Sequence, residues 1–266
     1  MLLGIDHVVL ACADPDATAA ELESKLGIAA TGGGRHEALG TWNRLVWLGD
    51  AYLELVGVFD PELASRSWFG RPVLAALELG GGLVTWAVAV DDLDETLRWA
   101  PPTAGLVGPL DGERRRTDER VVRWRLAHPI ELSATAPFLI EHDRQAAEWT
   151  DADRAARADE HHPIGGRVRL AGLEIVAASP AVAAGRLRSL LAAAVEPAGR
   201  AAVRVRFAAH EVRFVATRTG SPAVVDVVAD VPLRTRVGRV GDCDIRLRGT
   251  PTPVGASPQP ESDPDV

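Results

Sequence analysis

A strand followed directly by a helix start recurs along this chain, and the spacing of that recurrence constrains the fold more than any other feature. Residues 3–14 form an apolar run that ends at Asp14-Pro15, an aspartate suited to cap a helix and a proline suited to its first turn. Residues 83–92 repeat this order, and residues 170–179 repeat it more weakly. The predicted caps lie 78 and 87 residues apart (92 − 14 and 179 − 92). Such intervals are too long for a solenoid repeat and predict whole repeated modules.

Strand-like stretches follow each predicted helix. They lie at residues 42–48 and 51–59 after the first helix, at 120–127 and 137–141 after the second, and at 203–208 and 211–217 after the third. Gly49-Asp50 is suited to the turn of a hairpin between the first two of these. Residues 223–232 are compatible with either a strand or a helix. Each copy is therefore predicted as a strand, a helix and two or three antiparallel strands, which makes the chain an α+β protein.

The repeat also sets the predicted domain boundaries. They are a first module at 1–60, a connecting segment at 61–82 with a short helix near 72–79, a second module at 83–142, a polar linker with a solvated helix at 143–166, a third, degenerate module at 167–248, and a disordered tail at 249–266. The tail is predicted because it holds Pro, Ser, Asp and Glu with almost no large apolar residue.

Composition excludes several classes of protein. The 266 residues carry a net charge of −8 without a basic helix face, so nucleic-acid binding is not expected. No apolar run is long enough to span a membrane, and no signal peptide is evident, so we expect a cytoplasmic protein. Two cysteines cannot build a disulfide framework or a four-thiolate zinc site. Hydrolase and dinucleotide-binding motifs are also missing from the sequence.

Three ionisable side chains occur inside apolar strands, where burial would be costly. His7 lies between Ile5 and Val9, Glu54 lies within an apolar segment, and Glu141 ends the last strand of the second copy. A metal ion or a cationic partner would remove the cost of burying such carboxylates. The alternative is that each Glu faces water on the wet side of an antiparallel sheet, and that His7 is a structural residue.

The sequence resembles the vicinal oxygen chelate superfamily, and more narrowly the glyoxalase-like domain proteins of bacteria. It covers about residues 3–248 and is strongest over the first 142 residues. The matching pieces are Ile5-Asp6-His7-Val8-Val9 with Asp14-Pro15-Asp16, Gly33-Gly34-Arg35-His36 through Gly40-Thr41-Trp42-Asn43, Tyr52-Leu53-Glu54-Leu55, Trp86 to Asp94, Arg123-Trp124-Arg125-Leu126, Pro137-Phe138-Leu139-Ile140-Glu141 and His162-Pro163.

The resemblance implies tandem βαβββ modules that form a cupped mixed sheet around a divalent metal, with a third, partial module behind them. Carried over, the metal ligands would be His7, Glu54 and Glu141. The fourth ligand position falls on Thr85, where the family pattern has His or Gln, so the metal would be held weakly or be absent. The third copy has Gly172 at the same register and offers no ligand.

A glycine-rich segment at residues 31–36 precedes the second strand of the first module. It is either a flexible connection or a segment that bends over the cup, with Arg35 and His36 contacting the substrate and His36 acting as a general base. Asn43 is a further candidate for substrate contact. Trp86 and Trp124 are the tryptophans predicted to line the cup.

Other polar residues are predicted to have no role in the site. His142 is expected to point to the face opposite Glu141 and to begin a turn, and residues 114–116 are expected to form a mixed-charge loop. His161 and His162 read as part of the linker.

Two functions remain open from the sequence. The first is a divalent-metal-dependent enzyme of the lyase or isomerase type that acts on a small oxygenated molecule. The second is a metal-free protein that binds or sequesters a small molecule in the same cup, a function that the missing ligand at Thr85 favours. Two modules in one chain make a self-contained site, and a homodimer stays open as well.

Overall fold

The first module folds as a strand, a helix and three strands, as the repeat predicts. The computed structural model describes residues 2–116, 118–191, 193–199 and 201–250. The module contains β1 (Leu2–Ala11), α1 (Pro15–Leu26), β2 (Gly32–His36), β3 (Thr41–Leu48) and β4 (Ala51–Val58). The Asp14 side chain accepts from the backbone N–H groups of Asp16 and Ala17, and Gly27 ends the helix with a left-handed conformation (φ 72°).

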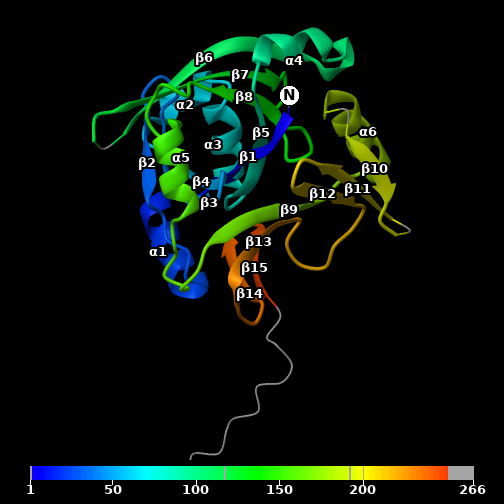
Figure 1. Cartoon of the computed structure of the whole chain (residues 1–266). Coiled ribbons are helices and arrows are strands. Elements are labelled where there is room, and N and C mark those ends of the chain that lie inside the picture. The colour runs from blue at the N-terminus through cyan, green and yellow to red at the C-terminus, as the bar shows by residue number, and fades with distance from the viewer. Residues whose placement is uncertain (1, 117, 192, 200, 251–266) are drawn as a thin grey trace, which may run out of the picture.

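The second module repeats this order after two connecting helices. The elements are α2 (Pro61–Arg66), α3 (Gly70–Glu78), β5 (Gly82–Val90), α4 (Leu93–Trp99), the short 3₁₀ helix η1 (Pro102–Ala104), β6 (Leu106–Arg116), β7 (Val121–Pro129) and β8 (Phe138–His142). The predicted cap is confirmed, because the Asp92 side chain accepts from the Glu95 backbone N–H. Together the two modules form the α+β cup that the sequence predicts (Figure 1).

The cup is closed into a barrel by two segments that the sequence predicts as loops. The strand order is β1-β4-β3-β2-β6-β7-β8-β5, and β2 pairs with β6 at Gly34↔Arg116 and Arg35↔Arg115. The glycine-rich segment is therefore a strand, and residues 114–116 belong to a strand as well. A Cβ atom at Gly34 would lie 2.3 Å from the Arg115 carbonyl oxygen, so only glycine permits this close approach. Sequence periodicity could not reveal a strand that has glycines in place of alternating apolar residues.

The third copy is more complete than the sequence indicates, and a fourth, helix-less copy follows it. After the linker helix α5 (Asp151–Ala158) come β9 (Val168–Val176), α6 (Pro180–Leu191), β10 (Ala194–Pro197), β11 (Ala202–Phe207) and β12 (His210–Val215). The chain then continues through β13 (Ala223–Pro232), β14 (Arg236–Val240) and β15 (Cys243–Thr250). Residues 223–232, left open between strand and helix, thus form a strand. The tail predicted at 249–266 starts two residues too early, because Gly249 and Thr250 belong to β15, and its remainder at 251–266 lies outside the described residues.

The second sheet repeats the pairing of the barrel without closing. Its order is β10-β11-β12-β9-β13-β15-β14. β9 is parallel to β12 and antiparallel to β13, as β1 is to β4 and β5. β13 is parallel to β15, as β5 is to β8. No strand among the described residues takes the place of β6, so the sheet stays open.

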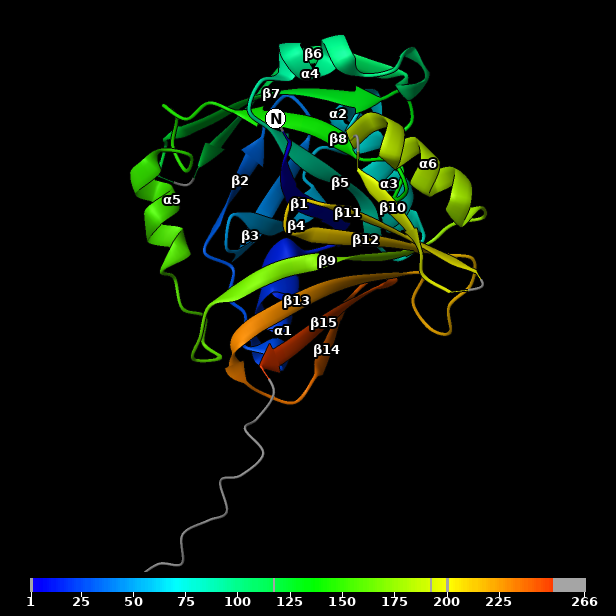
Figure 2. The same ribbon diagram turned by 45° about the vertical axis from the view of Figure 1, so that its right-hand side comes forward.

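The second sheet packs against the outside of the barrel, as Figure 2 shows, and one apolar core extends through both. β9 contacts β3 and β4, and α1 contacts β14, where a Cβ atom at Gly238 would lie 2.9 Å from Leu26 Cδ1. A hydrogen bond of 3.1 Å from the Ile5 backbone N–H to His210 Nδ1 also joins the two units. Within the described residues, none of the helices has the length and apolar character needed to cross a membrane.

Candidate active site in the barrel

The barrel encloses a cavity of about 920 Å³ that holds most of the site residues predicted from the sequence. His7, His36, Asn43 and Glu54 lie on its polar side. Five aromatic side chains form much of the remaining wall, namely Tyr52, Trp68, Phe69, Trp124 and Phe138. The cavity has the size and mixed lining of a site for a small molecule.

The Glu54 carboxylate is the centre of the polar side. Its side chain comes from β4 and the residue is 4% exposed. Asn43 Nδ2 donates to Oε1 over 2.6 Å, while Nε2 of His7 lies 3.6 Å from Oε2 and Nε2 of His36 lies 3.8 Å from Oε1. The two imidazole distances are too long for hydrogen bonds. Glu54 therefore keeps free acceptor capacity toward the cavity.

His7 is held in place by a buried carboxylate that the sequence analysis missed. Asp6 Oδ1 lies 2.6 Å from His7 Nδ1, and Asp6 Oδ2 lies 2.9 Å from His142 Nε2. Burial by itself would raise the pKa of Asp6, but the charges and hydrogen bonds of His142 and His7 outweigh it and hold that pKa well below its usual range. An ionised Asp6 accepts an N–H from each imidazole, which leaves His7 Nε2 facing Glu54.

The positions of Asp6 and His142 correct the expectation that His142 points away from the cup. His142 lines the cavity and its ring stacks on Trp149 with centroids 3.5 Å apart. The register of β1 against β5 shifts between Ile5 and His7, and such an irregularity breaks the strict alternation of side chains. Adjacent residues of β1 can therefore both reach polar partners inside the barrel, which alternation alone does not predict.

His36, the predicted general base, lies on the opposite side of Glu54 from His7. Its Nδ1 lies 3.0 Å from Thr41 Oγ1, and the edges of Phe69 and Trp124 enclose its ring. Burial lowers the pKa of His36 to about 4; the Glu54 charge opposes this shift and the Arg114 charge adds to it. His36 is therefore neutral at pH 7, with one nitrogen as donor and the other as acceptor.

Glu141 does not join His7 and Glu54. It reaches the rim of the cavity, but its carboxylate accepts from the Leu93 backbone N–H over 3.1 Å and lies 3.6 Å from Arg125. Thr85 is buried and donates to the Ala136 carbonyl. Among the described residues, no group of three or more His, Cys, Asp or Glu side chains could hold a metal ion. The predicted donor set of His7, Glu54 and Glu141 therefore does not fit a metal in this arrangement.

The predicted substrate-contact residues divide between the cavity and the outer core. Asn43 and Trp124 line the cavity, and Arg35 lies at its edge with its guanidinium 4.4 Å from the Phe59 ring centre. Trp86 does not line it. Its side chain is fully buried between the barrel and the second sheet, where it donates to the Ala134 carbonyl and stacks on Phe207. Trp86 is thus a core residue, because its face of β5 is covered by the second sheet.

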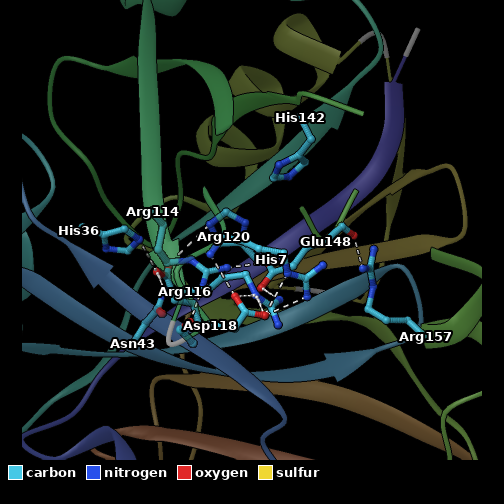
Figure 3. A network of polar contacts seen from close by, with 12 residues as sticks. His7, His36, Asn43, Arg114, Arg116, Asp118, Arg120, His142, Glu148 and Arg157 are labelled. Carbon is cyan, nitrogen blue, oxygen red and sulfur yellow. Dashed lines mark hydrogen bonds and ion pairs between the residues drawn. The ribbon is translucent and has the colours of Figure 1, made fainter. Parts of the chain in front are cut away.

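The linker after β8 closes one side of the cavity, where the sequence predicts a solvated segment. Helix α5 has no buried residues, in agreement with that prediction, but Glu148 and Trp149 before it are buried and line the cavity. Glu148 pairs with Arg114 and Arg116, both at 2.5 Å (Figure 3), and Arg157 lies 4.0 Å from the Trp47 ring centre. Glu148 also has a left-handed backbone conformation (φ 70°), a strained state that tertiary contacts must hold.

No curated protein matched. A hypothetical protein from Staphylococcus aureus has the same fold over nearly the whole chain, with 13% identity, a TM-score of 0.76, and coverage of 94% of this chain and 100% of that chain.

Two weaker structural matches cover about half of this chain. One is a Streptomyces coelicolor methylmalonyl-CoA epimerase variant in complex with 2-nitronate-propionyl-CoA, with 20% identity, a TM-score of 0.40, and coverage of 53% of this chain and 98% of that chain. The other is methylmalonyl-CoA epimerase from Mycobacterium tuberculosis, with 23% identity, a TM-score of 0.39, and coverage of 52% and 86%. At these scores neither match carries an argument about this chain.

The family comparison agrees with the resemblance seen in the sequence. The glyoxalase-like domain matches residues 5–191, which include both modules of the barrel, the linker, and β9 and α6 of the second sheet. This match spans well over half of the chain. The protein therefore belongs to the glyoxalase-like domain family.

Proposed function

We propose that this protein binds a small oxygenated molecule in the barrel cavity and transfers a proton on it, as an isomerase or lyase does. The observation that supports this most strongly is the state of Glu54. Its buried carboxylate has one hydrogen-bond donor among the described residues, Asn43, and two imidazole Nε2 atoms that stand too far away to satisfy it. A carboxylate held in an enclosed, aromatic-walled cavity with free acceptor capacity is suited to act as a general base.

The surrounding residues have separate roles in this proposal. Glu54 accepts a proton from a carbon next to a carbonyl group; the electron pair of the C–H bond forms a C=C bond, and the π pair of the carbonyl group moves to its oxygen to form an enolate. When Thr41 donates to His36 Nδ1, Nε2 carries the proton of the neutral ring and can donate to that oxygen. Where the deprotonated carbon carries a hydroxyl group the enolate is an enediolate: the hydroxyl proton moves to the first oxygen, and Glu54 returns its proton to the former carbonyl carbon, which completes an isomerisation. Asn43 and Asp6 are positioning residues that hold Glu54 and His7.

The metal-dependent form of this function stays a prediction. His7 and Glu54 are close to each other, but the third predicted ligand, Glu141, is held by the start of α4 instead. Metal analysis of protein purified without chelators tests this form. Less than about 0.1 equivalent of any divalent metal, together with no thermal shift on adding Zn²⁺, Mn²⁺ or Mg²⁺, would argue against it.

The second candidate is a metal-free protein that sequesters a small molecule. The aromatic wall supports this alternative, because large aromatic surfaces provide binding energy without requiring any chemical step. The two candidates differ in whether the Glu54 carboxylate is needed for a rate or only for an affinity.

Solvent exchange can separate the two candidates. Small carbonyl compounds that bind the full chain, found by ligand-observed NMR, are incubated with it in D₂O, and incorporation of deuterium next to the carbonyl is followed. We expect at least one of them to exchange at least tenfold faster with the wild type than with Glu54→Gln. Equal exchange rates for both proteins with every bound compound would refute the enzymatic proposal and support sequestration.

A further inference from the structure

Two buried polar atoms at the cavity have no hydrogen-bond partner within the described structure. They are Asn43 Oδ1 and His142 Nδ1. Asn43 is 2% exposed and the His142 side chain is 7% exposed, so bulk water does not satisfy either atom. Asn43 uses its amide nitrogen to donate to Glu54, and His142 uses Nε2 to bind Asp6. Asn43 Oδ1 is a hydrogen-bond acceptor, and His142 Nδ1 is one in the tautomer that donates Nε2–H to Asp6.

The neighbouring carboxylate is an acceptor as well. The Glu54 carboxylate offers acceptor oxygens, while His7 donates through Nδ1 to Asp6. The buried arginine at this cavity, Arg114, is already bound within the protein, because it donates to the Gly33 carbonyl and to Glu148. A ligand that satisfies this side of the cavity must bring N–H or O–H groups with it.

The charge balance of the buried groups points in the same direction. Glu148 neutralises Arg114 and also pairs with Arg116, which binds Asp118 in addition (Figure 3). Glu54 has no arginine or lysine within ion-pair distance among the described residues, and the imidazoles of His7 and His36 lie 3.6 Å and 3.8 Å from its oxygens. A buried carboxylate without a cation is unfavourable, so a ligand that brings a positive charge would be stabilised beside it.

The wall of the cavity suits a cation as well. Tyr52 stacks on His7 with centroids 4.6 Å apart, and Phe138 meets the same ring edge-on at 5.3 Å. Phe69 and Trp124 enclose His36 on the other side of Glu54. Aromatic faces attract ammonium and guanidinium groups, and the attraction grows when water is excluded.

From the orphaned acceptors, the unpaired carboxylate and the aromatic wall we infer that the barrel cavity recognises an organic cation, a protonated amine whose ammonium group lies beside Glu54. The inference rests on the proposed role of this cavity as the ligand site. It adds the substrate class: the oxygenated molecule also carries an amine, and its N–H groups bind the acceptors of Glu54, Asn43 and His142.

Three probes of similar size and different charge test the inference. They are 2-phenylethylamine as the cation, 2-phenylethanol as the neutral analogue and 3-phenylpropionate as the anion. Binding to the chelator-treated full chain is measured at pH 7 by calorimetry and by ligand-observed NMR. We expect the amine to bind at least tenfold more tightly than the alcohol, and the anion to bind most weakly. An anion that binds as tightly as the amine overturns the inference.

Variants locate the charge preference within the cavity. Glu54→Gln is expected to lower amine affinity at least tenfold and to change 2-phenylethanol affinity less than twofold. The matched control is Glu21→Gln, an exposed carboxylate on α1 outside the cavity lining, which should leave both affinities unchanged. Should Glu54→Gln not fold by circular dichroism, Trp124→Leu replaces it, with a larger loss expected for the amine than for the alcohol. Equal losses for both probes in a folded variant contradict the inference.

The inference and the proposed function fail differently. Amine binding that depends on Glu54, without solvent exchange of any bound carbonyl compound, supports the cation inference and removes the enzymatic proposal. Conversely, Glu54-dependent exchange of an anionic carbonyl compound, with no amine binding, supports the enzymatic proposal and removes the inference.

Discussion

In the barrel, β4 carries Glu54 into an enclosed cavity, whereas in the second sheet the corresponding strand β12 carries Arg213 to an open face. Val9 of β1 and Glu174 of β9 are equivalent positions, because each lies the same number of residues before the proline that begins the following helix, α1 or α6. Val9 pairs with Glu54 across the parallel ladder, and Glu174 pairs with Arg213. The same topological position thus holds a buried carboxylate in one unit and a partly exposed arginine in the other.

Glu174 in the second sheet and Glu54 in the barrel differ in their ion-pair partners. Glu174 is bound by Arg213 at 2.8 Å and by Arg218 at 3.1 Å, and Arg218 continues to Asp244 at 3.5 Å. Glu54 has no such partner in its 4% exposed position. The difference follows from closure, because β2 pairs with β6 in the barrel and the second sheet has no strand in that place. An open sheet can pair its charges in water, while a closed one can keep a polar group unpaired for a ligand.

The largest effect is expected from opening the barrel. Gly34→Val places side-chain atoms against the Arg115 carbonyl, where even a Cβ atom would be 2.3 Å away, so β2 and β6 must separate. We expect a loss of about 3 kcal/mol in the free energy of unfolding, measured by urea denaturation, together with loss of ligand binding. The control is Gly185→Ala in α6, where nothing lies within 4 Å and a gain of about 0.5 kcal/mol is expected. An unchanged stability for Gly34→Val would show that closure is not needed.

A pH effect is expected at the contact between the two units. Burial lowers the pKa of His210 from 6.5 to about 4, and its Nδ1 must be unprotonated to accept from the Ile5 N–H. Between pH 4 and pH 6.5 the unfolded chain therefore binds more protons than the folded chain. The contribution of His210 to the free energy of unfolding is complete above pH 6.5, falls as the pH drops toward 4 and is constant below it. The contribution is on the order of 2–3 kcal/mol.

Comparison with a variant isolates this contribution from that of His36, whose lowered pKa acts in the same direction. Denaturation of the wild type and of His210→Gln is measured from pH 7.5 to pH 4.5. The wild type should lose more stability than the variant over this interval. Identical pH profiles would show that His210 does not join the barrel to the second sheet.

The smallest expected effects are changes in stability that have opposite signs in the barrel and in the second sheet. Glu54→Gln removes an unpaired buried charge and should stabilise the ligand-free protein by about 1 kcal/mol, since functional carboxylates of this kind cost stability. Glu174→Gln removes a charge bound by two arginines and should destabilise it by about 1 kcal/mol. Both are measured by urea denaturation at pH 7. If both substitutions change the free energy of unfolding in the same direction, the barrel and the second sheet do not differ in how these carboxylates are compensated.

The sequence predicted those features of the site that depend on local spacing. The caps at Asp14 and Asp92 locate the modules, and strand patterning places His7 and Glu54 inside an apolar sheet, where the structure brings them to the same cavity. These predictions succeed because a cap and a strand are decided by residues a few positions apart.

The tertiary structure alone decided which residues surround the site. The irregular register of β1 brings Asp6 and His142 together, while Glu141 is held at the start of α4 and Trp86 is covered by the second sheet. Closure of the barrel depends on the pairing of β2 with β6, about 80 residues away in the sequence. The position of Glu148 depends on Arg114, about 30 residues away. Strand alternation tells which side chains share a face only while the ladder stays regular, and it does not specify which distant segment covers that face. For this reason the repeat determined the modules, and the pairing between distant strands determined the cavity.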